Sequence, residues 1–164
     1  MDIKIFTDGS CVKKGTQCKA SYGYYMTIDG QEYEDYRLLE DEKTNNKAEI
    51  SGIILALEIL NNFVQLNDRV AIYSDSEYTI KSLTEWIINW KKNGWKTANK
   101  KPVKNVELIK QMDELYESVK SKCHNIIIKH IMAHQKEPPK GTLEWELWYG
   151  NNRVDTELRK LTII

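Results

Sequence analysis

Four acidic residues lie where the surrounding sequence predicts buried or half-buried structure. Asp8 ends a short run of apolar and β-branched residues, and Asp75 directly follows a second such run. Glu49 lies on the flank of an apolar helical stripe, and Asp155 lies beside the apolar positions of a closing helix. Because a buried carboxylate is costly without a partner, these four side chains are candidates to meet a cation.

The chemistry of such a group is that of a divalent metal site. Each like-charged pair about 4 Å apart costs on the order of 1 kcal/mol in water and about 4 kcal/mol near a protein surface. A cluster of acids therefore persists only if cations bind or some members take up protons. All-oxygen ligands favour Mg²⁺ or Mn²⁺ over zinc. The alternative is that the four acids are ordinary surface charges.

The elements that must position these acids alternate between strands and helices. Strands are predicted at 3–8, 22–28, 31–38 and 69–74, with a charged loop at 40–43 and a helix at 46–62 capped by Thr44 or Asn45. Asp29-Gly30 indicates a two-residue hairpin. The strand–helix–strand order makes the first and fourth strands candidates for a parallel pair. Sites form beyond the carboxyl ends of such strands, which is where Asp8 and Asp75 are expected.

The second half of the chain is predicted to complete one α/β domain over residues 1–164. Helices are predicted at 76–83, at 84–92, from Pro102 to about 119, and at 151–161. A fifth strand is predicted at 124–131, and loops at 11–21, 93–101 and 135–148. These elements predict a mixed five-stranded sheet with helices on both faces.

Charge is unevenly distributed although the chain is neutral overall, with 24 basic and 24 acidic residues. Segment 86–106 holds six lysines and no acid, and it includes Trp86, Trp90 and Trp95. Lysines interleaved with aromatic rings predict a nucleic-acid surface, with the charges on phosphates and the rings against sugars. The plainer alternative is a solvated face with the tryptophans in the core.

The three cysteines are odd in number and lack CxxC spacing, so they predict neither a disulfide framework nor a zinc site. This usage favours a reducing compartment and a cytoplasmic location. The chain starts without a charged-then-apolar leader, and no apolar run approaches the roughly 18–20 residues of a membrane helix. No membrane partner is expected, and since nothing demands a dimer, a monomer is expected.

Four short motifs, in this order, resemble the carboxylate motifs of the type 1 ribonuclease H family. They are Thr7-Asp8-Gly9-Ser10, Thr44-Asn45-Asn46-Lys47-Ala48-Glu49, Ser74-Asp75-Ser76 and Asn151-Asn152-Arg153-Val154-Asp155. Segment 86–106 is similar to the basic protrusion of bacterial members, and the resemblance runs from Ile3 to about Leu158. It implies a ribonuclease H-like fold and endonucleolytic hydrolysis of the RNA strand of RNA/DNA hybrids, leaving 3′-hydroxyl and 5′-phosphate ends.

The resemblance also implies two bound Mg²⁺ ions, with Mn²⁺ as a substitute. By resemblance Asp8 contacts both ions, Asp155 the ion on the side of the attacking water, and Glu49 and Asp75 the ion on the leaving-group side.

His134 follows the predicted fifth strand and resembles the mobile histidine of the family, which assists proton transfer or product release. His130, four residues earlier, is a rival for this assignment. The segment from His134 to Asp155 is longer than in the usual family member and carries Trp145 and Trp148. This departure indicates a substrate contact or a packing flap.

Substrate contacts are implied by the same resemblance. The backbone and side chains that border the RNA strand, with its 2′-hydroxyls, are those of Gly9, Cys11, Asn45, Asn46 and Ser76. Thr44 is expected at a DNA phosphate and Trp86 near DNA sugars. In the protrusion, the contacting residues are expected to be Lys91, Lys92, Trp95, Lys96, Lys100 and Lys101.

Two positions depart from the bacterial pattern. Lys14 replaces a usual Asn, which strengthens phosphate attraction. Glu77 replaces a usual Gln and cannot donate a hydrogen bond when ionised, so the RNA contact there is expected to be weaker or altered.

Other functions compete with this one. One is a nuclease of the same fold with another substrate, such as a resolvase or the domain attached to a reverse transcriptase. A length of 164 residues without a polymerase argues against the latter unless the chain is an excised piece. Another is a hybrid-binding module without catalysis, which need not keep all four acids. A scaffold protein has no reason to align acids with strand ends.

Overall fold

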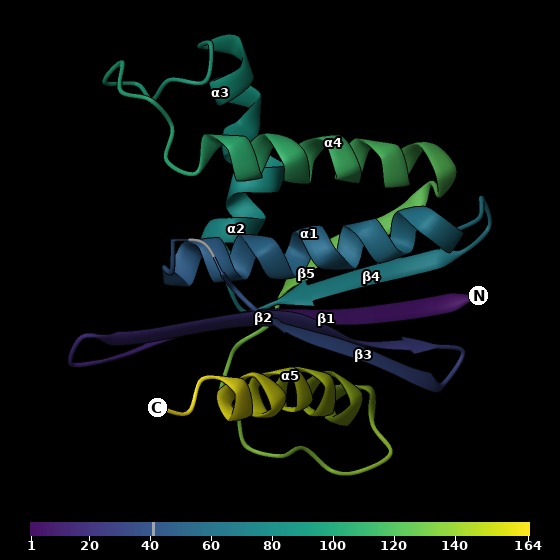
Figure 1. The fold of residues 1–164 in the computed structure, drawn as a ribbon. Helices are drawn as coiled ribbons and strands as arrows, with labels where there is room; N and C mark the ends of the chain where they lie inside the picture. Colours follow the sequence, from purple (N-terminus) through teal and green to yellow (C-terminus); the bar gives the residue numbers. More distant parts are fainter. Residues whose placement is uncertain (41) are drawn as a thin grey trace.

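The computed structural model describes residues 1–40 and 42–164. Its centre is a five-stranded sheet in the order β3-β2-β1-β4-β5 (Figure 1). The strands are β1 (Asp2–Lys14), β2 (Gln17–Ile28), β3 (Gln31–Leu38), β4 (Arg69–Ser74) and β5 (Asn125–His130). The first three strands pair antiparallel, whereas β1–β4 and β4–β5 are parallel. The predicted mixed sheet is confirmed, including the parallel pairing of the first and fourth strands.

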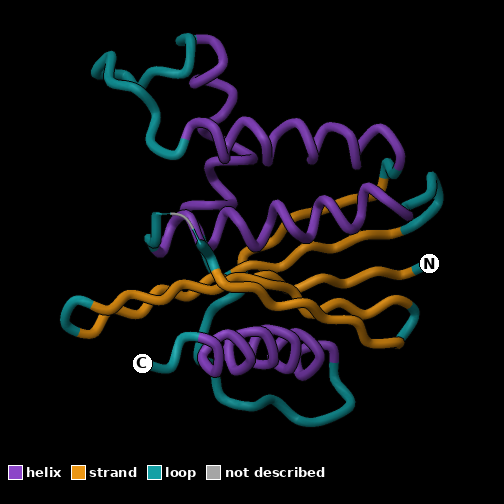
Figure 2. The backbone as a smooth tube through the Cα atoms, in the orientation of Figure 1, coloured by secondary structure: helices purple, strands orange, loops and turns teal. Residues whose placement is uncertain are grey.

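Helices cover both faces of this sheet, as predicted (Figures 1 and 2). On one face lie α1 (Asn45–Phe63), α2 (Glu77–Lys81), the π-helical turn η1 (Ser82–Trp86), α3 (Ile87–Lys92) and α4 (Val106–Lys122). On the other face lies α5 (Leu143–Leu161). Among the described residues, no helix combines the length and apolar character that a membrane span needs.

Alternation along β1 places side chains in two cores. Ile3 and Ile5 pack on the side of α1, where the larger core lies. Phe6 faces the other way and packs with Tyr25 and with Val154 of α5. The strand is therefore covered on both faces, which is why its sequence is nearly continuously apolar up to Asp8.

The expected loop at 11–21 is wrong. β1 continues to Lys14 and β2 begins at Gln17, so the two strands form a long ribbon joined at Gly15-Thr16. This arm projects well beyond the body of the sheet (Figure 2). Because most of its side chains are exposed, it lacks the apolar alternation that marks a strand in sequence. Asp8 consequently lies within β1 rather than at its end.

Two other boundaries differ from the sequence-based prediction. Pro102 does not start a helix; it pairs with Lys96 in an isolated bridge, and α4 begins at Val106. The expected loop at 135–148 ends early, because Thr142 caps α5 and accepts a hydrogen bond from the Trp145 amide (3.1 Å). The Pro and Gly residues of the segment concealed this helix start.

The remaining predictions hold closely. The hairpin at Asp29-Gly30 forms, with positive φ at both residues, and Thr44 is the N-cap of α1. The helices predicted at 76–83 and 84–92 form one nearly continuous stretch, with η1 at the junction. The predicted charged loop at 40–43 includes residue 41, which lies outside the described residues.

Candidate active site

Asp8 lies at the middle of the sheet, where β1 is flanked by β2 and β4. Its partner on β2 is Gly23, and the last β1–β4 pair in the register is Thr7 with Ser74. The Gly9 amide donates a hydrogen bond to Asp8 Oδ1 (2.8 Å). Asp8 is only 5% exposed, so its charge is largely removed from water.

Two glycines bring α1 against β1 at this point. A Cβ added to Gly52 would lie 2.8 Å from the Asp8 carbonyl oxygen, and one added to Gly9 would lie 2.3 Å from the Ala48 carbonyl carbon. Both distances are too short for a real side chain, so the two backbones can cross only because neither position has a Cβ. The crossing brings Glu49, on the adjacent turn of α1, next to Asp8.

Parallel pairing supplies the third acid. Ser74 is the last residue of β4, and Asp75 follows it directly, beside the carboxyl end of the neighbouring strand. One carboxylate oxygen each from Asp8, Glu49 and Asp75 lies within 4.8 Å of the others. We refer to these three residues as the acidic centre.

The electrostatics of the acidic centre are those of crowded, desolvated carboxylates. Burial, followed by repulsion from Asp75, raises the pKa of Asp8 to about 7. Burial and the adjacent Asp8 raise the pKa of Glu49 well above its usual range. Burial and the charge of Asp155 raise the pKa of Asp75. All three groups thus hold a proton more tightly than they would in water, and bound positive charge would oppose this shift.

The donor set fits a divalent cation. Glu49 Oε2 is buried and has no hydrogen-bond partner among the described atoms, which is the state expected of a metal ligand. The group of possible ligands found among the described residues consists of carboxylates alone, which matches the preference of Mg²⁺ and Mn²⁺ for oxygen.

Asp155 lies near the acidic centre but is not among the three acids whose oxygens lie within 4.8 Å of one another. It is half-buried on α5, and its Oδ2 is 3.0 Å from Nη2 of Arg159. It lines a cavity of about 370 Å³ together with Asp75, His134 and Trp148. Its charge acts on both Asp8 and Asp75. The fourth acid therefore borders the cavity, on the other face of the sheet from α1.

The two candidate histidines occupy different positions around Asp75. His134 is exposed, lies in a turn with φ +57° and lines the cavity. His130 is the last residue of β5, and its Nε2 lies 3.2 Å from the main-chain carbonyl oxygen of Asp75. His134 is thus placed at the cavity, and His130 contacts the backbone of an acid.

The predicted substrate contacts outside the basic protrusion lie around the starts of two helices and along β1. Thr44 Oγ1 accepts a hydrogen bond from the Lys47 amide (3.1 Å), and Asn45 and Asn46 form the first turn of α1. Ser76 caps α2 in the same way, through the Thr79 amide (3.2 Å). The other four positions lie on β1 and at the first residue of α2: Gly9, Cys11, Lys14 and Glu77.

In the basic protrusion, 86–106, the lysines are not equivalent. Lys91 Nζ lies 2.7 Å from Oδ2 of Asp113, a buried residue of α4, so its charge is already matched. The other predicted contact lysines are exposed: Lys92, Lys96, Lys100 and Lys101.

The tryptophans of the protrusion also differ from one another. Trp86 is exposed and packs between the rings of Tyr78 and Trp90. Trp95 is half-buried against the core and lies 5.3 Å below Nζ of Lys110. Trp86 is therefore the more exposed of the two predicted contact tryptophans.

Comparison with known proteins identifies the family. The model of the ribonuclease H (RNase H) family matches residues 1–161. This chain is a ribonuclease H family member. It is 35% identical over 153 residues to a ribonuclease H of Pseudomonas savastanoi pv. phaseolicola, covering 93% of this chain and 87% of the relative. It is 45% identical over 114 residues to that of an Enterobacter species, covering 68% and 67% of the two chains.

Solved structures agree on the ribonuclease H fold. The PFV RNase H domain superposes with a TM-score of 0.74 at 23% identity, covering 98% of this chain and 93% of that one. The family and the fold class predicted from the four motifs are confirmed.

Two residues near the site were not predicted from sequence as site residues. Asn151 of this ribonuclease H family member is buried, lines the cavity beside Asp75, and its Oδ1 has no partner among the described atoms. Its place in the fourth motif was the available signal. Asp113, the counter-ion of Lys91, gave no signal in the sequence. Its partner lies on a different helix, so the pairing depends on tertiary structure.

Proposed function

We propose that residues 1–164 act as one catalytic unit that hydrolyses the RNA strand of RNA/DNA hybrids. The cleavage is endonucleolytic and leaves 3′-hydroxyl and 5′-phosphate ends. Family membership supports the reaction class. The single observation that carries the proposal is the acidic centre, whose oxygens lie within 4.8 Å of one another and whose pKa values are all raised.

The proposed cofactor is a pair of Mg²⁺ ions, with Mn²⁺ as a substitute. Asp8 would contact both ions, Asp155 the one on the side of the attacking water, and Glu49 and Asp75 the other. When bound, such a pair activates water and stabilises the leaving oxygen. Burial of Asp8 contributes to this role, because a carboxylate removed from water binds a cation more strongly than an exposed one does.

His134 is proposed to move a proton at the cavity, between the attacking water or leaving oxygen and solvent. Its exposure allows exchange with bulk water, and it lines the same cavity as Asp75 and Asp155, which supports this role. His130 is assigned a supporting contact instead, because its ring reaches the Asp75 main chain.

Hybrid binding is proposed to use both ends of the site. The caps of α1 and α2, with Thr44, Asn45, Asn46 and Ser76, would meet the backbone and 2′-hydroxyls near the acidic centre. The exposed lysines of the basic protrusion would meet phosphates further along the duplex. Trp86 would lie against sugars, whereas Lys91 contributes less because Asp113 matches its charge.

Two further proposals concern the state of the protein. A monomer is proposed, since one chain supplies all four acids and the basic protrusion. A reducing location such as the cytoplasm is proposed, because Cys11, Cys18 and Cys123 are free thiols. Cys11 and Cys18 lie with their sulfur atoms 3.7 Å apart without being bonded.

The experiment that tests the reaction compares one labelled sequence as an RNA/DNA hybrid, an RNA duplex and a DNA duplex. Each is incubated with Mg²⁺ and with EDTA. Cutting of the RNA strand of the hybrid alone, and only with Mg²⁺, is expected. Hybrid binding without cutting would replace the enzyme by a binding module, and cutting of the DNA duplex would assign the fold a different substrate.

A further inference from the structure

The first turns of α5 lie outside the family motif that carries Asp155. Helix α5 begins at Leu143, eight residues before Asn151. Its N-cap, Thr142, accepts a hydrogen bond from the Trp145 amide and donates one to the Pro139 carbonyl (2.7 Å). The start of this helix is therefore fixed by an N-cap.

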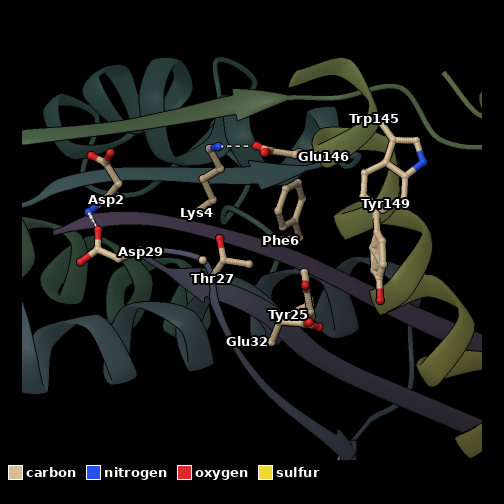
Figure 3. Close-up of a pocket in the computed structure, with 11 residues that line it drawn as sticks. Asp2, Lys4, Phe6, Tyr25, Thr27, Asp29, Glu32, Trp145, Glu146 and Tyr149 are labelled. Carbon is tan, nitrogen blue, oxygen red and sulfur yellow. Dashed lines mark hydrogen bonds and ion pairs between the residues drawn. The ribbon is translucent and has the colours of Figure 1, made fainter. Parts of the chain in front are cut away.

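Contacts with the sheet fix these turns in place. Lys4 of β1 pairs with Glu146 (2.7 Å), as Figure 3 shows beside a second cavity of about 420 Å³. The ring of Tyr149 packs on that of Tyr25, and Trp145 meets Tyr149 edge to face with centroids 5.0 Å apart. One residue further on, a Cβ on Gly150 would lie 2.3 Å from the ring of Phe6, so the helix presses directly on β1.

From this fixed position two indoles reach back to the segment that follows His134. Trp148 Nε1 donates a hydrogen bond to the Gln135 main-chain carbonyl oxygen (2.9 Å). Trp145 Nε1 donates one to the side chain of Glu137 (3.0 Å). The first of these bonds ends on the residue immediately after His134.

His134 itself has a backbone conformation that requires such support. Its φ of +57° lies in the left-handed region, which costs roughly 1–3 kcal/mol for a residue other than glycine and persists only where the surroundings hold it. The neighbouring side-chain bond, from Gln135 Nε2 to the Ala133 carbonyl, is longer at 3.4 Å, and both it and the Trp148 bond are exposed to solvent. The Trp148 bond is the shorter and better-anchored restraint.

We propose that Trp148 is a positioning residue for His134. Its indole N–H ties the Gln135 carbonyl to a helix seated on the sheet, and so holds the His134 backbone at the cavity that Asp75 and Asp155 line. This inference rests on the proposed function, because it assigns Trp148 an effect on the proton transfer that His134 performs. Trp145 gives weaker support, since its partner is a side chain, that of Glu137, rather than the main chain next to His134.

The test measures kcat and KM on an RNA/DNA hybrid for Trp148→Phe, which keeps a ring and removes the N–H. The matched control is Trp145→Phe, the same change one turn earlier. Trp148→Phe is expected to lower kcat roughly 3- to 10-fold, the effect of one lost hydrogen bond, with KM within about twofold of wild type. Trp145→Phe is expected to lower kcat by about twofold or less.

A double variant separates positioning from general destabilisation. If Trp148 acts through His134, then His134→Ala/Trp148→Phe should have the kcat of His134→Ala alone. A double variant that falls below His134→Ala by the full Trp148→Phe factor would overturn the proposal, as would wild-type kcat in Trp148→Phe. If Trp148→Phe does not fold, slow hydrogen exchange at the wild-type Trp148 Nε1–H supports the proposal and rapid exchange overturns it. Failure of the wild-type protein to cut the hybrid would instead refute the proposed function.

Discussion

The acidic centre and the basic protrusion arrange their charges in opposite ways. The three acids of the centre are crowded and largely buried, and their positions are fixed by backbone contacts at Gly9 and Gly52. The lysines of the protrusion are spread over an exposed segment, and only Lys91 has an ion-pair partner among the described acids. The centre therefore depends on precise placement, whereas the protrusion depends on the amount of positive charge.

This difference predicts how each region responds to substitution. If the centre binds metal as proposed, replacing one of its acids removes a ligand, so the loss is expected in kcat. Replacing one lysine of the protrusion removes one of several similar charges, so the loss is expected in KM and in the dependence on salt.

The largest effect is expected for Asp8→Asn. This change keeps the shape of the side chain and removes the charge that we propose binds the cation. Because the lost interaction is worth several kcal/mol, hybrid cleavage is expected to fall by about 10³-fold or more. Single-turnover cleavage with saturating enzyme measures the loss. Residual activity above a tenth of wild type would show that Asp8 is not a metal ligand.

The stability of the metal-free protein should depend on pH through the same residue. The pKa of Asp8 is about 7 in the folded state, above its ordinary value of 3.8, so the folded state holds the proton more tightly. The contribution of Asp8 to stability is fully present below about pH 4 and is lost as the pH rises through about 7, by up to a few kcal/mol at ~1.4 kcal/mol per unit. Urea unfolding in EDTA at pH 5 and pH 8 measures this decline, which should be smaller in Asp8→Asn. Equal pH dependence in both proteins would contradict the raised pKa.

A smaller effect is expected for Gly52→Ala, which tests the placement of the centre. The new Cβ would lie 2.8 Å from the Asp8 carbonyl oxygen, so α1 must move away from β1 and carry Glu49 with it. We expect a loss of about 1–3 kcal/mol in the free energy of unfolding, and a fall in kcat. The control is Ser51→Ala, at the adjacent half-buried position. A gain of up to about 1 kcal/mol, as helix propensity alone predicts, would refute the close crossing.

The basic protrusion is tested by replacing its four exposed lysines with alanine: Lys92, Lys96, Lys100 and Lys101. KM should rise by about 10-fold or more while kcat stays near wild type. The slope of log KM against log salt should also fall, by up to about 0.9 for each phosphate that the variant no longer neutralises. Lys160→Ala, at the end of α5, is the control and should change neither quantity. Unchanged salt dependence in the fourfold variant would exclude the protrusion from binding.

The smallest effect compares two adjacent lysines. Lys91→Ala leaves Asp113 without its ion-pair partner and should lower the free energy of unfolding by about 1 kcal/mol, with little change in KM. Lys92→Ala should do the reverse, with unchanged stability and a modest rise in KM. Thermal unfolding and steady-state kinetics on both variants make the comparison, and equal KM values would show that the two charges are equivalent.

The sequence predicted the centre better than it predicted the segments around it, and the reason is physical. Asp8, Glu49 and Asp75 follow apolar patterns whose periods determine which face each residue occupies. Their meeting then follows from the parallel pairing of β1 and β4. The two glycines that bring α1 onto β1, Gly9 and Gly52, are seen in the sequence, but only the structure shows how closely the two backbones approach there.

The arm of β1 and β2 and the start of α5 were missed for different reasons. The arm at 11–19 is held by backbone pairing with mostly exposed side chains, so composition alone resembled a loop. The start of α5 follows a segment with two prolines and a glycine. These residues predict a loop more strongly than the N-cap Thr142 predicts a helix start. The Lys91–Asp113 pair could not be predicted, because a charge run shows nothing of its tertiary partners.

The most direct test of the central claim is a calorimetric titration of Mn²⁺ into the substrate-free protein at pH 7, in two buffers of different ionisation enthalpy. If the acidic centre is the metal site, its acids lose protons when the cation binds, because their pKa values are raised. We predict binding with proton release in the wild-type protein, and binding at least about 10-fold weaker in Asp8→Asn. Binding that is equally tight in both proteins, without proton release, would contradict the assignment of the acidic centre as the metal site.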